Sequence, residues 1–202
     1  YADDMWNAVL KAGKKHKLMV IAPAHHRRIQ AGILSWGQDL DAEHNPFQCN
    51  LGYQVSLSGK GEWNKTADYV GKEALEKMKE ELKNGAKPYK LQLVGLVLGG
   101  KPIEEYAPDF WLISNESGGK PVGFITSPWY HPEKKTNIAM GYVPFDGTLN
   151  QNGFPKGTKG AKFKVHLPAK YSEKPGKPVD AVVVDIPFTE SYYANTREVV
   201  KG

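Results

Sequence analysis

The amino-acid pattern changes near residues 85–89, and this change constrains the fold more than any other feature. After it, short stretches in which apolar residues alternate with polar or small ones are separated by Gly and Pro. Residues 115–119, Asn-Glu-Ser-Gly-Gly, are typical of the turn of a β-hairpin. Short strands without a helical pattern between them predict an antiparallel barrel or sandwich. The expected strands are residues 90–98, 110–114, 121–127, 137–143, 161–167 and 179–186.

The part before this change mixes helical and extended patterns, so the whole chain is predicted to be of the α+β class. Residues 3–13 begin with acidic side chains, continue with apolar residues at helical spacing and end in Gly, which predicts a helix. The clearest helix is expected at residues 68–84, where one apolar stripe follows a face and Gly85 can end it. Further elements are expected at residues 25–33 (helix), 18–22 (strand) and 50–57 (strand).

Composition and charge are those of an ordinary globular protein, because 40% of the 202 residues are hydrophobic and 24% are charged. The net charge is +5, but basic residues alternate with acidic ones, as in residues 72–83. That mixture is typical of a solvated helix face and gives no support to nucleic-acid binding. A mildly basic protein also suits a small anionic ligand. No stretch approaches the ~20 apolar residues of a membrane span.

Cys49 is the single cysteine, so a disulfide framework is excluded. We therefore expect a reducing compartment, which is the cytoplasm, or the mitochondrial matrix if the source is eukaryotic. A lone Cys is more often a small buried hydrophobic residue than a nucleophile. The chain starts at Tyr1 without a signal-type segment, and we expect it to be a piece of a longer protein.

Residues 24–55 place arginines and turn-forming acids beside aromatic rings, which suits a pocket wall for a flat anionic ligand. The alternative is a helix cap and loop that joins two layers. Arg28 can bind a carboxylate through two hydrogen bonds, or pair at the surface with an acid further along. Trp36 can stack on a flat ring, although a place in the core is the commoner use. Asp39 and Asp41 can act as paired acids, but turns and caps are the commoner role.

Motifs for several kinds of catalysis are missing from the sequence. His25 and His26 are adjacent, so regular structure points them to different sides, and there is no HxxxH, CxxC or Cys–His cluster. There is also no GxSxG, no complete GxxxxGK[ST] and no GxGxxG. The sequence therefore predicts no metal site and supports neither a serine hydrolase nor a nucleotide-binding loop.

Four segments resemble the glycine cleavage T-protein family, in the family's order and over nearly the whole chain. The family patterns include R-[LI]-E-[AGS]-[GA]-x-x-x-[YW]-G-x-D, D-[FY]-[IV]-G-[KR]-E-A-L and G-x-[IV]-T-S followed by IAMGYVP. No single pattern is specific, but together they are. The matching segments are residues 28–41 (RIQAGILSWGQDLD), 68–75 (DYVGKEAL), 123–144 (GFITSPWYHPEKKTNIAMGYVP) and 187–193 (PFTESYY).

This resemblance implies a tetrahydrofolate-dependent one-carbon transferase with three lobes, folate in the central hole and a jelly-roll-like β-barrel as the last lobe. It divides the chain into residues 1–88, the incomplete C-terminal part of a folate-binding α+β domain, and residues 89–202, the barrel. Arg28, Gln30 and Trp36 fall in the segment that lines the folate site in relatives. The family keeps its catalytic Asp in an N-terminal half that this chain lacks, so no catalytic residue is expected here.

The segment also departs from the glycine cleavage enzyme. Ala24 and His25 stand where that enzyme has Arg-Asp, and Gln30 and Trp36 replace its Glu and usual Tyr. These departures weaken the expectation of glycine cleavage as such.

Residues 45–51 (NPFQCNL) and 55–57 (VSL) are more similar to the methyl-transferring branch, such as the dimethylsulfoniopropionate demethylases. Two functions therefore stay open. One is an aminomethyl- or methyltransferase whose partners are its own N-terminal half, a small one-carbon donor and, as a further candidate, a lipoyl carrier protein. The other is a non-catalytic folate-binding or regulatory module.

Overall fold

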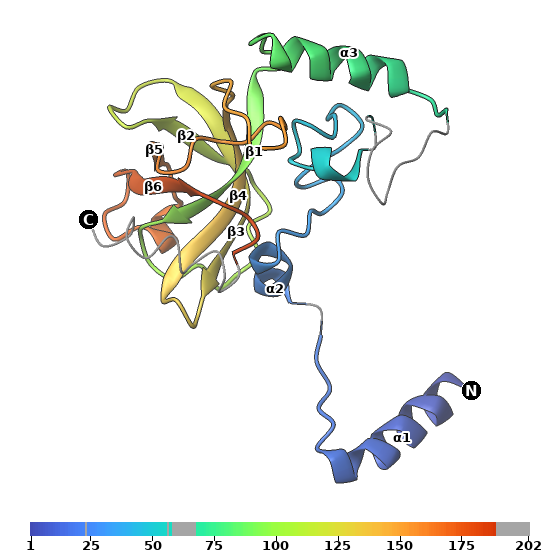
Figure 1. Cartoon of the computed structure of the whole chain (residues 1–202). Coiled ribbons are helices and arrows are strands. Elements are labelled where there is room, and N and C mark those ends of the chain that lie inside the picture. Colours follow the sequence, from blue (N-terminus) through green and yellow to red (C-terminus); the bar gives the residue numbers. More distant parts are fainter. Residues whose placement is uncertain (23, 56, 58–67, 189–202) are drawn as a thin grey trace.

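The computed structural model describes residues 1–22, 24–55, 57 and 68–188, and its main body is a closed antiparallel β-barrel (Figure 1). Neighbouring strands follow the order β1-β4-β3-β2-β5-β6, and β6 pairs with β1 to close the barrel. This confirms the predicted α+β class and the antiparallel barrel. The strands are β1 (Leu91–Leu98), β2 (Trp111–Asn115), β3 (Pro121–His131), β4 (Thr136–Pro144), β5 (Lys162–Val165) and β6 (Val179–Val184).

The strand β1 is buried on both faces, which explains its almost continuous apolar sequence. Side chains alternate along a strand, so Val94, Leu96 and Leu98 point into the barrel. There they join a hydrophobic core to which all six strands contribute residues. Leu93 and Val97 point outward and join a second cluster that covers the barrel's outer face. That outer cluster is closed by residues from outside the barrel, and these are Ile29, Leu34, Ile186 and Phe188.

The short helix α2 (His25–Gln30) covers this outer face beside β3 and β4. Its Ile29 has no exposed surface and packs into the outer cluster. The backbone of Phe188 donates a hydrogen bond of 2.6 Å to the Gln30 carbonyl, so the segment after β6 joins α2. Gly95 permits this packing, because a Cβ there would lie 2.5 Å from Ile186 Cγ2 and 3.0 Å from Phe188 Cζ.

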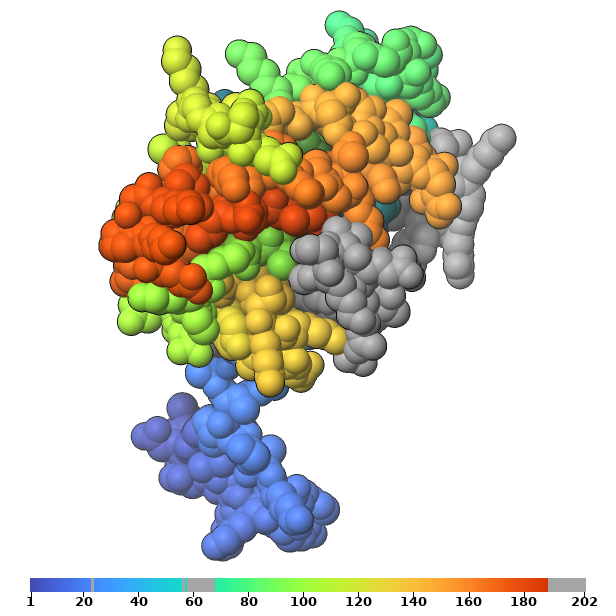
Figure 2. All heavy atoms as spheres, turned by 90° about the vertical axis from the view of Figure 1, so that its left-hand side faces the viewer, coloured from blue at the N-terminus to red at the C-terminus, as the bar shows by residue number. Residues whose placement is uncertain are grey.

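The remaining helices differ in how many of their side chains are buried against the rest of the protein. Helix α3 (Lys72–Lys83) buries Leu82 in a third cluster with Phe47 and Phe145. Helix α1 (Ala2–Gly13) has no buried residue within the described part of the chain and stands clear of the barrel (Figures 1 and 2). No helix of the described residues is both long and apolar enough to cross a membrane. Short 3-10 helices lie at Lys14–His16, Gly52–Gln54 and Ala169–Tyr171.

Two predicted strands are wrong. Residues 18–22 have no regular structure and are exposed, because a strand needs an edge to pair with and the described residues offer it none. Residues 50–57 instead contain a 3-10 helix, because Asn50 has a φ of 61° that takes the backbone out of the extended region. Ser56 lies outside the described residues, as does the 189–193 part of the predicted C-terminal motif.

The predicted helices are confirmed with shifted ends. Helix α3 begins at Lys72 and not at residue 68, since Gly71 has a φ of 89°, which a right-handed helix does not contain. Helix α2 stops at Gln30 and not at residue 33, since Gly32 turns the chain at a φ of 69°. Both ends are therefore set by a glycine in the left-handed region.

Candidate functional site

The predicted site segment is joined to the barrel by a buried carboxylate, Asp39. Its side chain has no exposed surface. Oδ2 accepts hydrogen bonds from Arg28 Nη1 at 2.7 Å and from the Ser35 backbone N–H at 2.8 Å. Oδ1 accepts from Thr126 Oγ1 at 2.5 Å and from Ser127 Oγ at 2.6 Å. We call Arg28, Gln38, Asp39, Thr126, Ser127 and Tyr142 the Asp39 network.

A β-bulge in β3 brings two neighbouring hydroxyl groups to this one carboxylate. Ile125 pairs with Gly141 and Ser127 with Met140, so Thr126 is the extra residue in the ladder with β4. Successive side chains of a regular strand point to opposite faces, whereas a bulge re-aims one of them. Thr126 and Ser127 can therefore both reach Asp39 Oδ1, and the bulge is the local feature that builds the site.

Arg28 donates four hydrogen bonds to the protein, two from each of its terminal nitrogens. Nη1 donates to Asp39 and to the Ile33 carbonyl at 3.2 Å. Nη2 donates to Ser127 Oγ at 2.7 Å and to Gln38 Oε1 at 3.1 Å. Of the two uses open to Arg28, the structure shows the ion pair with a downstream acid. That pair is partly buried and not at the open surface, because the Arg28 side chain is 18% exposed.

The network continues into β3 and β4. Gln38 Nε2 donates to the Thr126 carbonyl at 2.8 Å, and Tyr142 donates from its hydroxyl to the Asp39 carbonyl at 2.7 Å. Cys49 Sγ lies 3.5 Å from the same hydroxyl. Burial raises the pKa values of the Tyr142 phenol and the Cys49 thiol, so neither group supplies an anion at neutral pH. Cys49 is buried, as predicted.

Trp36 and Gln30 lie at the edge of this network and reach solvent. Trp36 is 71% exposed, so the expectation that it belongs to the core is wrong. It sits in a tight loop whose backbone pairs it with Leu40. Gln30 is half-buried at the end of α2. An exposed Trp ring beside polar groups is available for stacking on a flat ligand.

Asp39 and Asp41 differ although they are two positions apart. Asp41 is 53% exposed at its side chain, accepts from the Glu43 N–H at 2.9 Å and pairs with His44 at 2.7 Å. These hydrogen bonds lower the pKa of Asp41. Asp41 therefore has the predicted turn role, whereas Asp39 has a role that turn chemistry did not indicate.

A cleft of about 410 Å³ opens where the segment after α2 meets the end of β6. Such a volume lies within the usual range for small-molecule sites, about 300–1,000 Å³. Two amide side chains from distant parts of the sequence, Asn50 and Asn150, contribute to its walls. The cleft is lined by Ala31, Gly32, Leu34, Cys49, Asn50, Leu51, Tyr53, Asn150, Ile186 and Pro187.

His25, which replaces the family's Asp, packs in an aromatic environment at the start of α2. Its ring stacks on Trp129 at 5.5 Å between centroids and tilts against Tyr106 at 4.9 Å. Burial lowers the pKa of His25, and the charge of Arg28 lowers it further. His25 is therefore neutral near pH 7 and holds α2 to the barrel by ring packing.

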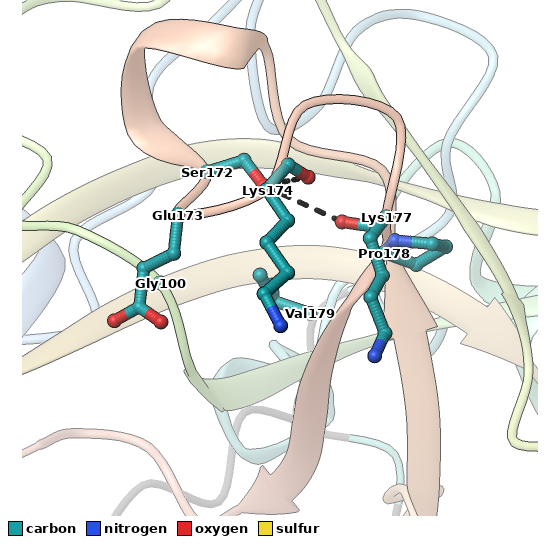
Figure 3. Close-up of a pocket in the computed structure, with 7 residues that line it drawn as sticks. All are labelled: Gly100, Ser172, Glu173, Lys174, Lys177, Pro178 and Val179. Carbon is teal, nitrogen blue, oxygen red and sulfur yellow. Dashed lines mark hydrogen bonds between the residues drawn. The ribbon is translucent and has the colours of Figure 1, made fainter.

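A second hollow of about 230 Å³ lies near the start of β6, beside residues 172–179 (Figure 3). Lys174 and Lys177 extend from this rim, and Ser172 donates from its hydroxyl to the Lys174 carbonyl at 2.9 Å. The hollow lacks the aromatic and buried charged groups of the Asp39 network. Within the described ranges, no group of three or more His, Cys, Asp or Glu side chains could hold a metal ion.

Thr126, Ser127, Gln38 and Tyr142 were not predicted as site residues. The Thr-Ser pair stands in the recognised 123–144 motif, but its sequence gives no sign of a bulge. A signal was nevertheless available, because a polar Thr-Ser pair interrupts an otherwise apolar strand.

Comparison with known proteins places the barrel in a family. Residues 92–190 match the family model described as the glycine cleavage T-protein C-terminal barrel domain. A dimethylsulfoniopropionate demethylase from Ruegeria pomeroyi is 34% identical over 141 residues, which are 69% of this chain and 33% of that protein. An aminomethyltransferase from a Synechococcus strain is 34% identical over 117 residues, 58% of this chain and 27% of the relative.

A mitochondrial aminomethyltransferase from Mesembryanthemum crystallinum is 29% identical over 194 residues, which are 96% of this chain and 40% of that protein. The crystal structure of a glycine cleavage system aminomethyltransferase from Bartonella henselae shares the fold, with a TM-score of 0.55 and 23% identity. That match covers 81% of this chain and 37% of the other. The chain thus spans about a third of the length of the curated relatives it matches.

A closed antiparallel barrel with this motif order defines the class as a T-protein-type β-barrel. Residues 92–190 belong to the glycine cleavage T-protein family as its C-terminal barrel domain.

Proposed function

We propose that this chain is part of a tetrahydrofolate-dependent one-carbon transferase of the glycine cleavage T-protein family. The observation that carries the proposal is the Asp39 network. It joins the segment with the predicted folate residues to the barrel motif, because Arg28 and Asp39 both bond to Ser127, which lies 99 and 88 positions further along the chain. Two of the four segments that carry the family resemblance, residues 28–41 and 123–144, therefore form one hydrogen-bonded unit.

The residues present fit a folate molecule, which combines a flat pterin with an anionic glutamate tail. Trp36 offers an exposed ring for stacking, and Gln30 offers an amide for hydrogen bonding at the end of α2. Arg28 contributes positive charge, but its terminal nitrogens are bound to the protein. Its part in folate binding is therefore to fix the loop that carries Trp36.

The proposed enzyme needs the part of the relatives that this chain does not span. We propose that residues 1–88 complete a folate-binding domain with that part, and that residues 89–202 form the barrel domain. Met5, Trp6 and Val9 of α1 are exposed, as are residues 18–21. An exposed apolar surface of this size usually packs against another part of a protein. A carboxylate from the same missing region would position the reacting nitrogen of folate.

Two donor classes match the relatives. An aminomethyl group on a lipoyl carrier protein corresponds to the aminomethyltransferases, and a methylsulfonium compound corresponds to the demethylase. Residues 45–51 favour the methyl donor, since they are more similar to the demethylase branch. Catalysis in either case rests mainly on proximity and electrostatics. We propose the cytoplasm, or the mitochondrial matrix in a eukaryote, as the location.

A non-catalytic folate-binding or regulatory module is the second candidate. Gln30 stands where the family pattern has Glu, Trp36 replaces its usual Tyr, and His25 is neutral where the family pattern has an acid. These changes preserve a surface for a flat ligand while removing charged groups. This candidate predicts folate binding without turnover.

Binding of tetrahydrofolate to the full-length protein, measured by titration calorimetry, tests what both candidates share. We expect saturable binding that Trp36→Ala weakens by about 0.5–1.5 kcal/mol, the usual size for one lost aromatic stacking contact. Tyr69→Ala is a matched control, because Tyr69 is another exposed aromatic residue and lies outside the network. Equal binding by wild type and Trp36→Ala would remove Trp36 from the site, and no binding by wild type would reject the folate assignment.

A further inference from the structure

Asp39 is the buried charged group whose purpose the proposed function leaves open. Its carboxylate accepts hydrogen bonds from Arg28, Thr126 and Ser127, as well as from the Ser35 backbone. Moving a carboxylate out of water is costly unless its oxygens are fully hydrogen-bonded. This carboxylate meets that condition, because each oxygen has two donors.

The same carboxylate closes the loop that carries Trp36. Ser35 donates its N–H to Asp39 Oδ2 at 2.8 Å, and its carbonyl accepts from the Asp39 N–H at 2.8 Å. Gly37 donates its N–H to the Leu40 carbonyl at 2.8 Å and has a φ of 79°, which reverses the chain. Residues 35–40 are therefore a small closed turn with Trp36 near its tip and Asp39 at its base.

The outcome is an exposed aromatic ring on a rigid base. Trp is usually well covered in folded proteins, whereas Trp36 is 71% exposed. The base of the loop is tied to β3 through Thr126 and Ser127 and to β4 through the Tyr142 hydroxyl. A ring held in place before the ligand arrives binds with a smaller entropy loss than a mobile ring.

We propose that Asp39 is a positioning residue that holds Trp36 in the orientation in which it stacks on folate. This inference rests on the proposed function. Asp39 acts through the loop and does not itself contact the ligand, because its side chain is fully covered by the protein.

The chemistry of the site requires Asp in particular. Asn has the same size, but it offers one acceptor oxygen in place of two and presents an NH₂ group to donors that need an acceptor. Asn at this position would also leave the Arg28 charge without its partner. Asp39→Asn therefore loosens the loop while it changes the volume of the side chain very little.

A double-mutant cycle on folate affinity in the full-length protein tests the proposal. The four proteins are wild type, Asp39→Asn, Trp36→Ala and the double variant, and titration calorimetry gives each dissociation constant. If Asp39 acts through Trp36, each single change weakens binding about tenfold and the double variant stays near tenfold. A double variant weakened about a hundredfold shows independent roles and overturns the proposal.

Two further variants keep the test decisive. Ser127→Ala removes one donor and leaves the charge pair in place, so it reports on loop position if Asp39→Asn does not fold. We expect it to weaken folate binding by about threefold, provided that Trp36 is present. Asp41→Asn is the matched control, since Asp41 is in the same segment but exposed, and its affinity should equal that of wild type.

The outcomes distinguish failure of the positioning role from failure of the proposed function. Wild-type affinity in Asp39→Asn, together with a lower midpoint of thermal unfolding, means that Asp39 only stabilises the fold and overturns the positioning role. Failure of wild type to bind tetrahydrofolate rejects the proposed function itself, and the positioning role with it. The expected pattern of non-additive loss supports both.

Discussion

Residues 18–22 and residues 35–40 are both short segments outside the barrel, yet they differ in how they are held. The first is apolar and exposed, with Met19 at 79% and Ile21 at 67% exposure. The second carries one acid, Asp39, and one glycine, and it is fixed to the barrel by the Asp39 network. An apolar sequence does not form a strand without a partner edge, whereas a few buried polar contacts define a loop fully.

Asp39→Ala should have the largest effect on the difference between these two segments, because it removes the group that fixes residues 35–40 to the barrel. It removes the acceptors of four donors and leaves Arg28 as an unpaired, mostly buried charge. We expect a loss of about 3–5 kcal/mol in the free energy of unfolding, as is usual when one partner of a buried pair is removed. Denaturant unfolding measures it. Asp41→Ala serves as a control and should destabilise the protein far less than Asp39→Ala, because the Asp41 side chain is 53% exposed.

Ser127→Ala should have a smaller effect of the same kind. The hydroxyl donates to Asp39 Oδ1 and accepts from Arg28 Nη2, so its loss leaves both groups short of one hydrogen bond. We expect about 1–3 kcal/mol from denaturant unfolding. A loss as large as that of Asp39→Ala would contradict the view that the carboxylate is the centre of the network.

His25 should make the packing of α2 against the barrel depend on pH, whereas residues 18–22 contain no titratable side chain. Burial and the nearby Arg28 hold the pKa of His25 below its ordinary value of 6.5. Because the folded pKa is the lower one, the stabilisation is complete above about pH 6.5 and is lost as the pH falls through the folded pKa. NMR titration of the ring should show this lowered pKa. His25→Gln should flatten the acid side of the stability profile, and an unchanged profile would contradict this assignment.

Removal of residues 1–22 should have the smallest effect on the barrel. This segment has no buried side chain in the described part of the chain. The free energy of unfolding of the barrel should therefore stay within about 0.5 kcal/mol of the value for the whole chain, as measured by denaturant unfolding. A large loss of stability would show that residues 1–22 pack against the barrel.

Much of the barrel could be predicted because local pattern and tertiary environment agree there. The hairpin signal, in which residues 110–114 and 121–127 flank a turn with Gly118 and Gly119, is visible in the sequence, and the structure confirms the hairpin. The strand prediction for residues 18–22 was wrong because an apolar pattern indicates that the side chains favour burial, but it does not show whether a neighbouring strand is available for pairing. Helix α3 began late because Gly71 at the start of its apolar stripe takes a left-handed conformation.

The candidate site could be predicted in part. Arg28 stood out because two adjacent arginines enter a short apolar turn, but its partner Ser127 lies 99 positions away. Asp39 looked like an ordinary turn residue, since nothing local shows that two hydroxyl groups will converge on it. A bulge depends on how two strands pair, and sequence periodicity does not contain that information. The folate roles of Arg28, Gln30 and Trp36 stay predictions.

We propose that the full-length protein transfers a one-carbon group to tetrahydrofolate. The most direct measurement offers tetrahydrofolate with either an aminomethyl-loaded lipoyl carrier or a methylsulfonium compound, and identifies the folate product by mass. We predict methyltetrahydrofolate from the sulfonium or methylenetetrahydrofolate from the carrier, and the product distinguishes the two branches. Neither product from either donor, in a protein that binds tetrahydrofolate, would contradict the transferase assignment and favour the binding module.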